Sequence, residues 1–247
     1  DVAETNAPEM EALSREKILQ EVISPYLQDL IPQAVPSHRE WIGTRLNMFT
    51  AAYNTKLVSD ADAPKSWQDL LQPKWANKLA VGHPGYSGAI GVMGVILSKL
   101  YGWKYFEQLE KNKPQIGRSI NDTVTALNAG ERQVAAGADG STLFSASRGN
   151  PLAINYPTDG SVLIISPSAI MKGTKHPNAA RLFMEYLMSP EASEVNVKHF
   201  GIPIRPEVKG APGTQPIDKI KVIRPTVAEI DKGIPVVIED WRDTFGN

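Results

Sequence analysis

A glycine-rich turn, Gly85-Tyr86-Ser87-Gly88-Ala89, separates a short apolar strand pattern at 79–81 from a long apolar helix pattern at 90–100. A loop that ends a strand and opens a helix directs several unpaired backbone N–H groups and the positive end of the helix dipole at one point. Such a loop binds an oxyanion without a charged side chain, and its glycines let the backbone approach the ligand closely. Ser87 is either a helix cap or a hydroxyl donor to that ligand. The turn therefore predicts an α/β unit with a site for a small anion.

Strand and helix patterns alternate through the middle of the chain. In order they are a strand at 79–81, helices at 90–100 and 103–111, a strand near 116–120, a helix at 123–128 and a strand at 133–137. This succession predicts an α/β domain with a largely parallel sheet.

Flanking segments extend the pattern on both sides. Residues 41–53 are rich in β-branched, aromatic and small apolar residues, which predicts a strand, and the apolar run 162–171 predicts a second long one. Ser66 and Asp69 have the spacing of a capping box. His176-Pro177 and Ser189-Pro190 are helix starts, and a last helix carries Trp241 and Phe245.

Charge and composition exclude several functions. The chain has 26 basic and 27 acidic residues, a net charge of -1, so no overall field attracts nucleic acid or an anionic membrane and any anion site is local. No apolar run reaches the length of a membrane span. The absence of cysteine excludes disulfides, thiolate metal sites and a cysteine nucleophile. The four histidines lack metal-ligand spacing, so we expect no metal and no cofactor.

Several segments carry a resemblance to a known family. They are residues 51–58 (AAYNTKLV), 65–70 (KSWQDL), 74–81 (KWANKLAV), 176–180 (HPNAA), 189–192 (SPEA) and 202–206 (IPIRP). Together they resemble the extracellular solute-binding proteins, family 1, of bacterial ABC importers, and more closely the ferric-ion-binding branch. The resemblance covers nearly the whole chain in the right order.

The resemblance implies an α/β fold of the periplasmic binding protein type II class, with two α/β lobes joined by two crossover strands at 45–53 and 162–171. Lobe 1 would comprise residues 1–46 and 168–247, and lobe 2 residues 47–167. It also implies a periplasmic protein, or an extracellular one tethered to the membrane, that is a monomer, is not an enzyme and delivers its ligand to an ABC permease. Family members begin with a strand and a helix ahead of the segment that residues 1–5 resemble, so we expect several tens of N-terminal residues to be missing from lobe 1.

The ferric-binding branch holds its anion with a Ser-Gly-Ala turn, an Asn before the next helix, and a second Asn ahead of two tyrosines. The turn matches Ser87-Gly88-Ala89, and Asn121 stands at the place of the first Asn. Asp139 replaces the second Asn, and Ser141 and Thr142 replace the tyrosines. Because Fe(III) prefers anionic oxygen ligands, these neutral hydroxyls argue against iron and leave an oxyanion site without its metal.

The nature of the ligand depends on Asp139, because an ionised carboxylate beside a bound anion must be protonated or face a donor on the ligand. We therefore expect a hydroxy or amino carboxylate first, then an aminophosphonate or phosphate ester. Asp139 could instead be a turn residue before Gly140. Arg45 is expected to bind a carboxylate through two parallel hydrogen bonds, or else to form a surface ion pair. Trp41 and Tyr86 would stack on the ligand or, for Trp41, pack in the core.

Two other readings remain open. Ferric iron stays possible as the ligand. A serine hydrolase is suggested because residues 85–89 differ by one residue from the G-x-S-x-G elbow, with Asp139 and His176 following in the right order. Against it, Ala89 replaces the last glycine, no HGGG-type segment is present, and His176-Pro177 begins a helix. Nothing in the charge pattern marks a protein-partner surface.

Overall fold

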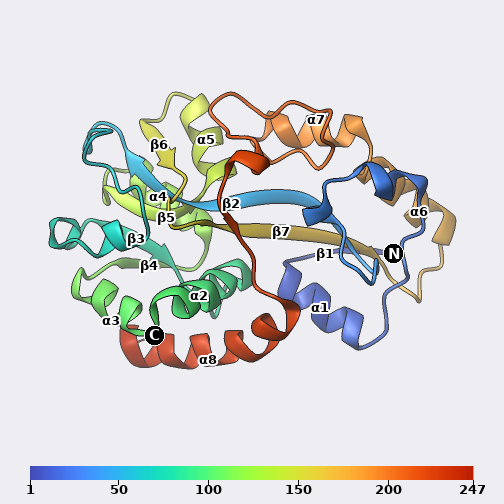
Figure 1. The fold of residues 1–247 in the computed structure, drawn as a ribbon, viewed down its shortest axis with the longest axis horizontal. Coiled ribbons are helices and arrows are strands. Elements are labelled where there is room, and N and C mark those ends of the chain that lie inside the picture. Colours follow the sequence, from blue (N-terminus) through green and yellow to red (C-terminus); the bar gives the residue numbers. More distant parts are fainter. Residues whose placement is uncertain (247) are drawn as a thin grey trace. The chain divides into compact units, whose positions relative to one another are not determined.

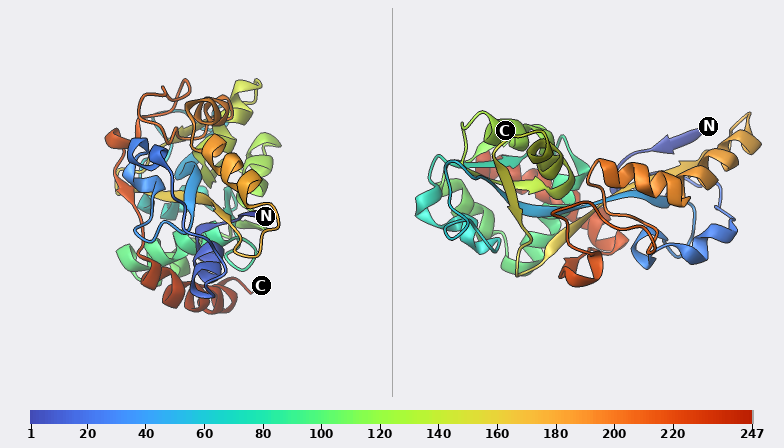
Figure 2. Two further views of the ribbon diagram at one scale, coloured as in Figure 1. Left: turned by 90° about the vertical axis from the view of Figure 1, so that its right-hand side faces the viewer. Right: turned by 90° about the horizontal axis from the view of Figure 1, so that it is seen from above.

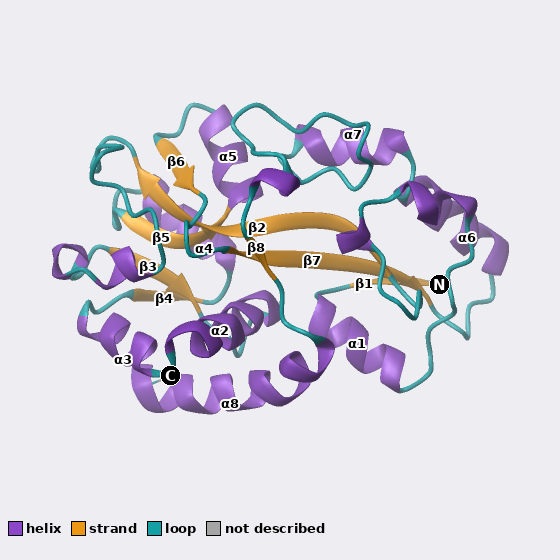
Figure 3. Cartoon of the chain, viewed as in Figure 1, coloured by secondary structure: helices purple, strands orange, loops and turns teal. Residues whose placement is uncertain are grey.

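The computed structural model describes residues 1–246, and the chain divides into two compact units. Unit 1 comprises Asp1–Asn47 and Ile164–Pro216, and unit 2 comprises Met48–Leu163 and Ile217–Asn247. The two boundaries fall inside the long strands β2 (Ile42–Asn54) and β7 (Ser161–Ile170), which are the longest orange arrows in Figure 3. Both strands expected to join the lobes are therefore continuous across the unit boundary.

Unit 1 is built from two segments that are far apart in the sequence. Its further elements are β1 (Val2–Glu4), α1 (Ala7–Arg15), two 3₁₀ helices (Pro25–Asp29 and Pro32–Ala34), α6 (Pro177–Leu187) and α7 (Pro190–Lys198). Strand β1 pairs antiparallel with β7, from Val2 opposite Ile170 to Glu4 opposite Ser168. Helices α6 and α7, coloured orange in Figure 2, pack on each other. Each starts with a proline in its first turn, as the sequence predicts.

Unit 2 holds most of the predicted alternation. Its elements after β2 are 3₁₀ helices at Gln68–Leu71 and Pro73–Trp75, β3 (Leu79–Gly82), α2 (Gly88–Tyr101), α3 (Lys104–Lys111), β4 (Gln115–Gly117), α4 (Ile120–Asn128), β5 (Val134–Ala138), α5 (Asp139–Ser147), β6 (Leu152–Asn155), a 3₁₀ helix at Ile217–Lys219, β8 (Val222–Ile223) and α8 (Val227–Phe245). The predicted capping box is present, since the Ser66 amide donates to Asp69 Oδ2 and the Asp69 amide to Ser66 Oγ.

The sheet of unit 2 mixes parallel and antiparallel strands. Strand β3 pairs in parallel with β4 on one side and β5 on the other, while β2 runs antiparallel to β5 and to β6. The order β6-β2-β5-β3-β4 follows. Helices α2, α3 and α8 make one layer in Figure 1, and α4 and α5 pack together and against the strands in another. The buried strands are continuous apolar runs because helices cover both faces of the sheet.

One difference from the sequence-based expectation is the start of α4. The predicted strand near 116–120 ends at Gly117, and the helix already begins at Ile120. The reason is local: Ser119 Oγ accepts from the Asp122 amide and the Asp122 carboxylate accepts from the Ser119 amide, which closes a capping box and starts the helix early. Helix α5 was not predicted at all.

The C-terminal segment also differs from expectation, because its described residues, 217–246, belong to unit 2 rather than to lobe 1. Helix α8 packs on α2 and α3. Trp241 is fully buried, with its ring centroid 5.4 Å from that of Phe106. Gly91 and Gly94 of α2 have no Cβ, and the places where one would stand are taken by side chains of Ile234 and Val237. This close approach of two helices depends on contacts distant in the sequence.

Candidate anion-binding site

Three helix N-termini lie at one edge of the unit 2 sheet. Strands β4, β3 and β5 are parallel neighbours, and they end at Gly117, Gly82 and Ala138. Each is followed by a helix, α4, α2 and α5 respectively (Figure 1). Because the carboxyl ends of parallel strands meet at the same edge, the positive ends of three helix dipoles come together there. This edge is the candidate site.

The β3–α2 loop has the geometry expected of an anion cradle. Ser87 is the N-cap of α2, with an extended backbone, and its carbonyl accepts the first helical hydrogen bond, from Gly91. Its hydroxyl makes no capping hydrogen bond, unlike that of Ser189, which accepts from the Ala192 amide at the start of α7. The first amides of α2, at Gly88 and Ala89, therefore lack a side-chain cap. The Ser87 hydroxyl and these amides are available to a ligand.

The loop itself is held by His83. The Gly85 amide donates to His83 Nδ1 at 2.9 Å, and the Tyr86 amide donates to the His83 carbonyl. His83 is buried, and its ring lies tilted against that of Tyr86 and edge-on to that of Trp241. Since Nδ1 accepts a hydrogen bond, neutral His83 carries its proton on Nε2. No pattern in the sequence indicates this role of His83.

A cation that the sequence analysis missed lies beside this loop. The guanidinium carbon of Arg118 is 5.4 Å from the centroid of the Tyr86 ring, and Tyr86 is 67% exposed. In the described part of the chain no carboxylate forms an ion pair with Arg118. The signal was present in the sequence: Arg118 follows Gly117, the last residue of β4, and Gly117 pairs with Gly82 of β3. A basic residue directly after a parallel strand faces the same edge as its neighbours' loops.

Asn121 lies at this edge, and its backbone carbonyl accepts a hydrogen bond from the Thr125 hydroxyl. It is the second residue of α4 and is exposed. The start of α4 is already satisfied by the capping box of Ser119 and Asp122. Contact between Asn121 and a ligand stays a prediction.

The placement of Asp139 corrects the expectation that it faces a ligand. Its side chain is fully buried. Oδ1 accepts hydrogen bonds from the Met48 amide at 2.9 Å and the Gly140 amide at 2.7 Å, and Oδ2 accepts from the Tyr156 hydroxyl at 3.3 Å. Burial nevertheless raises the pKa of Asp139 to about 7, against these hydrogen bonds, which lower it. Asp139 fastens the start of α5 to β2.

The expectation that Thr142 contacts a ligand is also wrong, whereas that for Ser141 stays a prediction. Thr142 is fully buried and its hydroxyl donates to the Ala138 carbonyl at 2.7 Å, one turn earlier in the chain. Ser141 is half-buried, with a long bond of 3.5 Å to the same carbonyl. Because α5 begins at Asp139, consecutive residues point to different faces of the helix, so only Ser141 keeps a partly open side.

Two expected ligand contacts belong to unit 1. Trp41 is 1% exposed and its Nε1 donates to Glu11 Oε1 at 3.0 Å, so the expectation that it stacks on a ligand is wrong and it is a core residue. Arg45 forms an ion pair with Glu4, and both side chains are about half exposed. The surface ion pair considered from the sequence is thus present, and a ligand contact by Arg45 stays a prediction.

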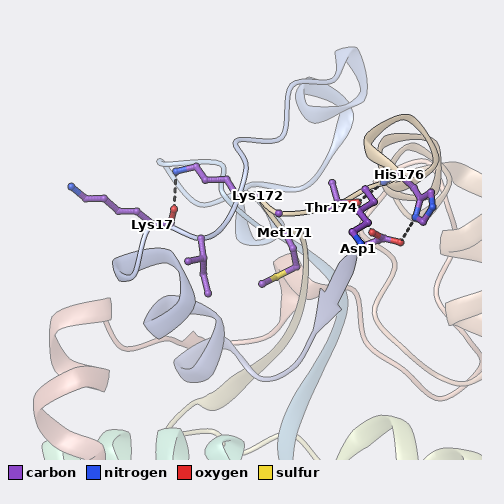
Figure 4. A pocket seen from close by; sticks show the side chains of 9 residues that line it. Asp1, Lys17, Met171, Lys172, Thr174 and His176 are labelled. Carbon is purple, nitrogen blue, oxygen red and sulfur yellow. Dashed lines mark hydrogen bonds and ion pairs between the residues drawn. The ribbon is translucent and has the colours of Figure 1, made fainter.

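The histidine of the hydrolase reading is also accounted for. His176 Nδ1 lies 2.9 Å from Asp1 Oδ2, beside a depression of about 640 Å³ in unit 1 (Figure 4). In the same view the Lys172 ammonium donates to the Lys17 carbonyl. Asp139 instead bonds to Met48, Gly140 and Tyr156. His176 and Asp139 therefore have partners other than each other.

Residues 1–246 contain no group of three or more His, Asp or Glu side chains that could hold a metal ion. Over the same residues, no helix combines the length and hydrophobicity required to span a bilayer.

Comparison with known proteins identifies the family. Residues 6–223 match the family described as bacterial extracellular solute-binding protein. The chain belongs to this family. It is a family of solute-binding proteins, not of enzymes.

Individual relatives bind different solutes. This solute-binding protein is 23% identical over 201 residues to the Fe(3+)-binding periplasmic protein of Serratia marcescens, covering 77% of this chain and 59% of the relative. It is 28% identical over 174 residues to a putative 2-aminoethylphosphonate-binding periplasmic protein of Salmonella typhimurium, covering 66% of this chain and 51% of the relative. It thus spans between half and three-fifths of the length of these relatives.

The fold agrees with that of a solved solute-binding protein. The periplasmic binding protein AfuA from Actinobacillus pleuropneumoniae, with fructose-6-phosphate bound, superposes with a TM-score of 0.86 at 19% identity. The match covers 100% of this chain and 82% of AfuA. The chain therefore has the fold of the periplasmic binding proteins, as the resemblance implied.

Proposed function

We propose that this chain captures a small oxyanion at the carboxyl edge of the unit 2 sheet, as the solute-binding component of an ABC importer. One observation carries the proposal: the N-cap of α2, Ser87, leaves its hydroxyl and the first helical amides without a side-chain cap, in the same loop as Tyr86, whose ring contacts the Arg118 guanidinium. Uncapped amides at the positive end of a helix dipole bind anions, and a guanidinium adds a full positive charge.

The ligand class follows from these donors. Hydroxyl, amide and guanidinium groups are all hydrogen-bond donors, so they suit a carboxylate, phosphonate or phosphate oxygen. We keep a small hydroxy or amino carboxylate, a phosphonate and a phosphate ester as candidates. Tyr86, exposed beside Arg118, would cover the ligand with its ring. The names of relatives support an anionic solute, since one relative is named a putative 2-aminoethylphosphonate-binding protein and one structural neighbour was solved with fructose-6-phosphate bound.

Closure of the lobes and delivery of the ligand to a permease are proposed from membership of the family. Solute-binding proteins of this class close their lobes on the ligand and hand it to a membrane permease, without chemistry. Arg45 is proposed as the contribution of unit 1. Its ion pair with Glu4 is half exposed, so exchanging Glu4 for a ligand carboxylate costs little.

Native mass spectrometry of the protein as purified tests the proposal, because a tightly held anion is carried through purification. Isothermal titration calorimetry with phosphate, methylphosphonate, 2-aminoethylphosphonate and lactate then ranks the candidates. Binding of at least one oxyanion supports the proposal. No binding by any of them, to protein that is shown to be folded and empty, contradicts it.

Ferric iron is a second candidate because the Serratia marcescens relative is an Fe(3+)-binding protein. In that case the oxyanion held by Ser87 and Arg118 would share the metal with tyrosines. Two tyrosines of unit 2 lie at this edge. Tyr86 belongs to the β3–α2 loop, and Tyr156 bonds to Asp139 at the start of α5. Ferric citrate titration separates this candidate from a metal-free anion.

A further inference from the structure

The buried carboxyl of Asp139 has no role in the proposed capture of an anion, yet it lies at the same sheet edge. It is fully buried at the first position of α5, and every group that bonds it is a hydrogen-bond donor. Among residues 1–246 no cation forms an ion pair with it. An isolated buried carboxylate is costly unless it is well bonded, or protonated.

Its partners can satisfy both protonation states. In the ionised state Oδ1 accepts from the Met48 and Gly140 amides and Oδ2 accepts from the Tyr156 hydroxyl. In the neutral state Oδ1 can remain the carbonyl oxygen that accepts from both amides, while the proton on Oδ2 is donated to the Tyr156 oxygen. A hydroxyl both donates and accepts, so the hydrogen bond only reverses its direction. Protonation therefore changes the charge without breaking the contacts.

The distance to the anion cradle is set by the sheet. Leu79 of β3 pairs with Val134 of β5 and Ala80 with Ala135, so the residues after each strand lie on neighbouring chains. Adjacent strands are roughly 4.8 Å apart, which puts the start of α5 within about 10 Å of the β3–α2 loop. An anion bound at Ser87 and an ionised Asp139 therefore repel each other through the low-dielectric interior.

Other ionisable groups at this edge are few. Tyr156 is the titratable side chain that bonds Asp139 directly. The β3–α2 loop brings His83, the β4–α4 loop brings Arg118, and the first turn of α4 brings Asp122. Met48 of β2 contributes only its backbone amide. Burial raises the pKa of Asp139 to about 7, with no charged side chain among the causes, so it titrates where a periplasmic protein works.

We propose that unit 2 takes up one proton together with its anion: binding of the oxyanion at Ser87 drives a proton from solvent onto Oδ2 of Asp139, whose hydrogen bond with Tyr156 then reverses. This inference rests on the proposed function and adds its regulation. Capture is tightest at mildly acidic pH and weakens as the pH rises through neutrality. The bound anion is most stable when Asp139 is protonated.

Calorimetry with sulfate tests the coupling, because sulfate keeps its charge of −2 across neutral pH and does not itself titrate. At about pH 7, titrations in two buffers of different ionisation enthalpy should show uptake of roughly half a proton per sulfate. Between about pH 6 and about pH 8 the affinity should fall about tenfold. A carboxylate and a doubly charged sulfate about 10 Å apart, at an effective dielectric constant of about 20, repel by more than about a hundredfold in affinity, so Asp139 stays protonated in the complex while the free protein loses its proton over this range.

The Asp139→Asn variant is the decisive comparison. Its amide keeps an acceptor oxygen for Met48 and Gly140 and can pair with Tyr156, so the fold is retained and a melting curve checks it. It should bind sulfate without proton uptake and with a flat pH profile. The His83→Gln variant removes the histidine of the β3–α2 loop and should still take up the proton, whatever its affinity.

The outcomes are distinct. Sulfate binding with the same proton uptake in wild type and Asp139→Asn overturns the inference but leaves the proposed function standing. Uptake that disappears in His83→Gln and persists in Asp139→Asn overturns it in favour of the histidine. If neither sulfate nor inorganic phosphate binds wild type at any pH, the proposed function fails and the coupling fails with it.

Discussion

The guanidinium carbon of Arg118 lies 5.4 Å from the centroid of the Tyr86 ring. The two residues come from different strand–helix connections, β4–α4 and β3–α2, and meet because Gly117 and Gly82 are register partners in parallel strands. The ring holds the guanidinium over the β3–α2 loop by a cation–π contact. It places one full positive charge beside the uncapped start of α2.

The first prediction removes that charge. Arg118→Gln should weaken binding of the ligand by about tenfold or more, because a charge-assisted hydrogen bond contributes about 1.5–3 kcal/mol. Arg118→Lys keeps the charge but loses the planar fork, so its affinity should lie between those of wild type and Arg118→Gln. Calorimetry measures both. Arg148, which lies over the Phe144 ring, is the matched control, and Arg148→Gln should bind like wild type. Equal losses in the two glutamine variants would mean that only net charge matters.

A second prediction separates the two roles of Ser87. Because its hydroxyl caps nothing, Ser87→Ala should leave the free energy of unfolding unchanged, whereas Ser189→Ala removes a formed cap and should cost about 1 kcal/mol. Ser87→Asp should stabilise the helix start while repelling the anion, so it should lower affinity by several kcal/mol without loss of stability. Urea unfolding and calorimetry provide the two readouts. Unchanged affinity in Ser87→Asp refutes the cradle.

The pH dependence of stability follows from Asp139. Its pKa is raised from 3.8 to about 7 in the folded chain, so between about pH 4 and about pH 7 the folded state holds a proton that the unfolded state has released. The contribution of this group to stability is therefore lost as the pH rises through that window and stays lost above it. The full loss is on the order of 4 kcal/mol.

Asp139→Asn lacks this titration. Its free energy of unfolding relative to wild type should increase steadily from about pH 4 to about pH 7 and then level off. Urea unfolding at a series of pH values measures the difference. A constant difference across the series would show that Asp139 titrates at its ordinary pKa.

The fourth prediction concerns the packing of α8 on α2. A Cβ added to Gly94 would stand 2.5 Å from Cγ1 of Val237, which is buried. Gly94→Ala should therefore lower the free energy of unfolding by about 1–3 kcal/mol through overpacking. Gly173→Ala is the control, since nothing lies within 4 Å of that position. If both variants unfold alike, α8 packs less closely than described.

The last prediction distinguishes iron from a metal-free anion. Thr142 is buried and bonded, and neutral hydroxyls do not ionise at neutral pH, so ferric citrate should produce no visible phenolate-to-iron absorption. Tyr86→Phe and Tyr156→Phe are the variants to compare. A visible band in wild type that disappears in either of them would assign iron as the cargo.

Local rules in the sequence determined much of unit 2. The Gly85–Ala89 turn, the apolar runs on either side and the Ser66–Asp69 capping box each act over a few residues, so propensity and short hydrogen bonds suffice to predict them. The start of α2 at Gly88 and the strand β3 followed from them. The family could also be predicted from the sequence, because the segments that carry the resemblance are short and follow one another in the right order.

Tertiary structure decided which side chains remain available. A sequence pattern assigns Trp41 and Asp139 to a ligand, but in the folded chain their partners are Glu11 and Met48, which lie far away in the sequence. Conversely, Arg118 meets Tyr86 only because β3 and β4 pair in register. Side-chain burial and charge pairing depend on residues brought together from distant parts of the chain, and no local pattern contains that information.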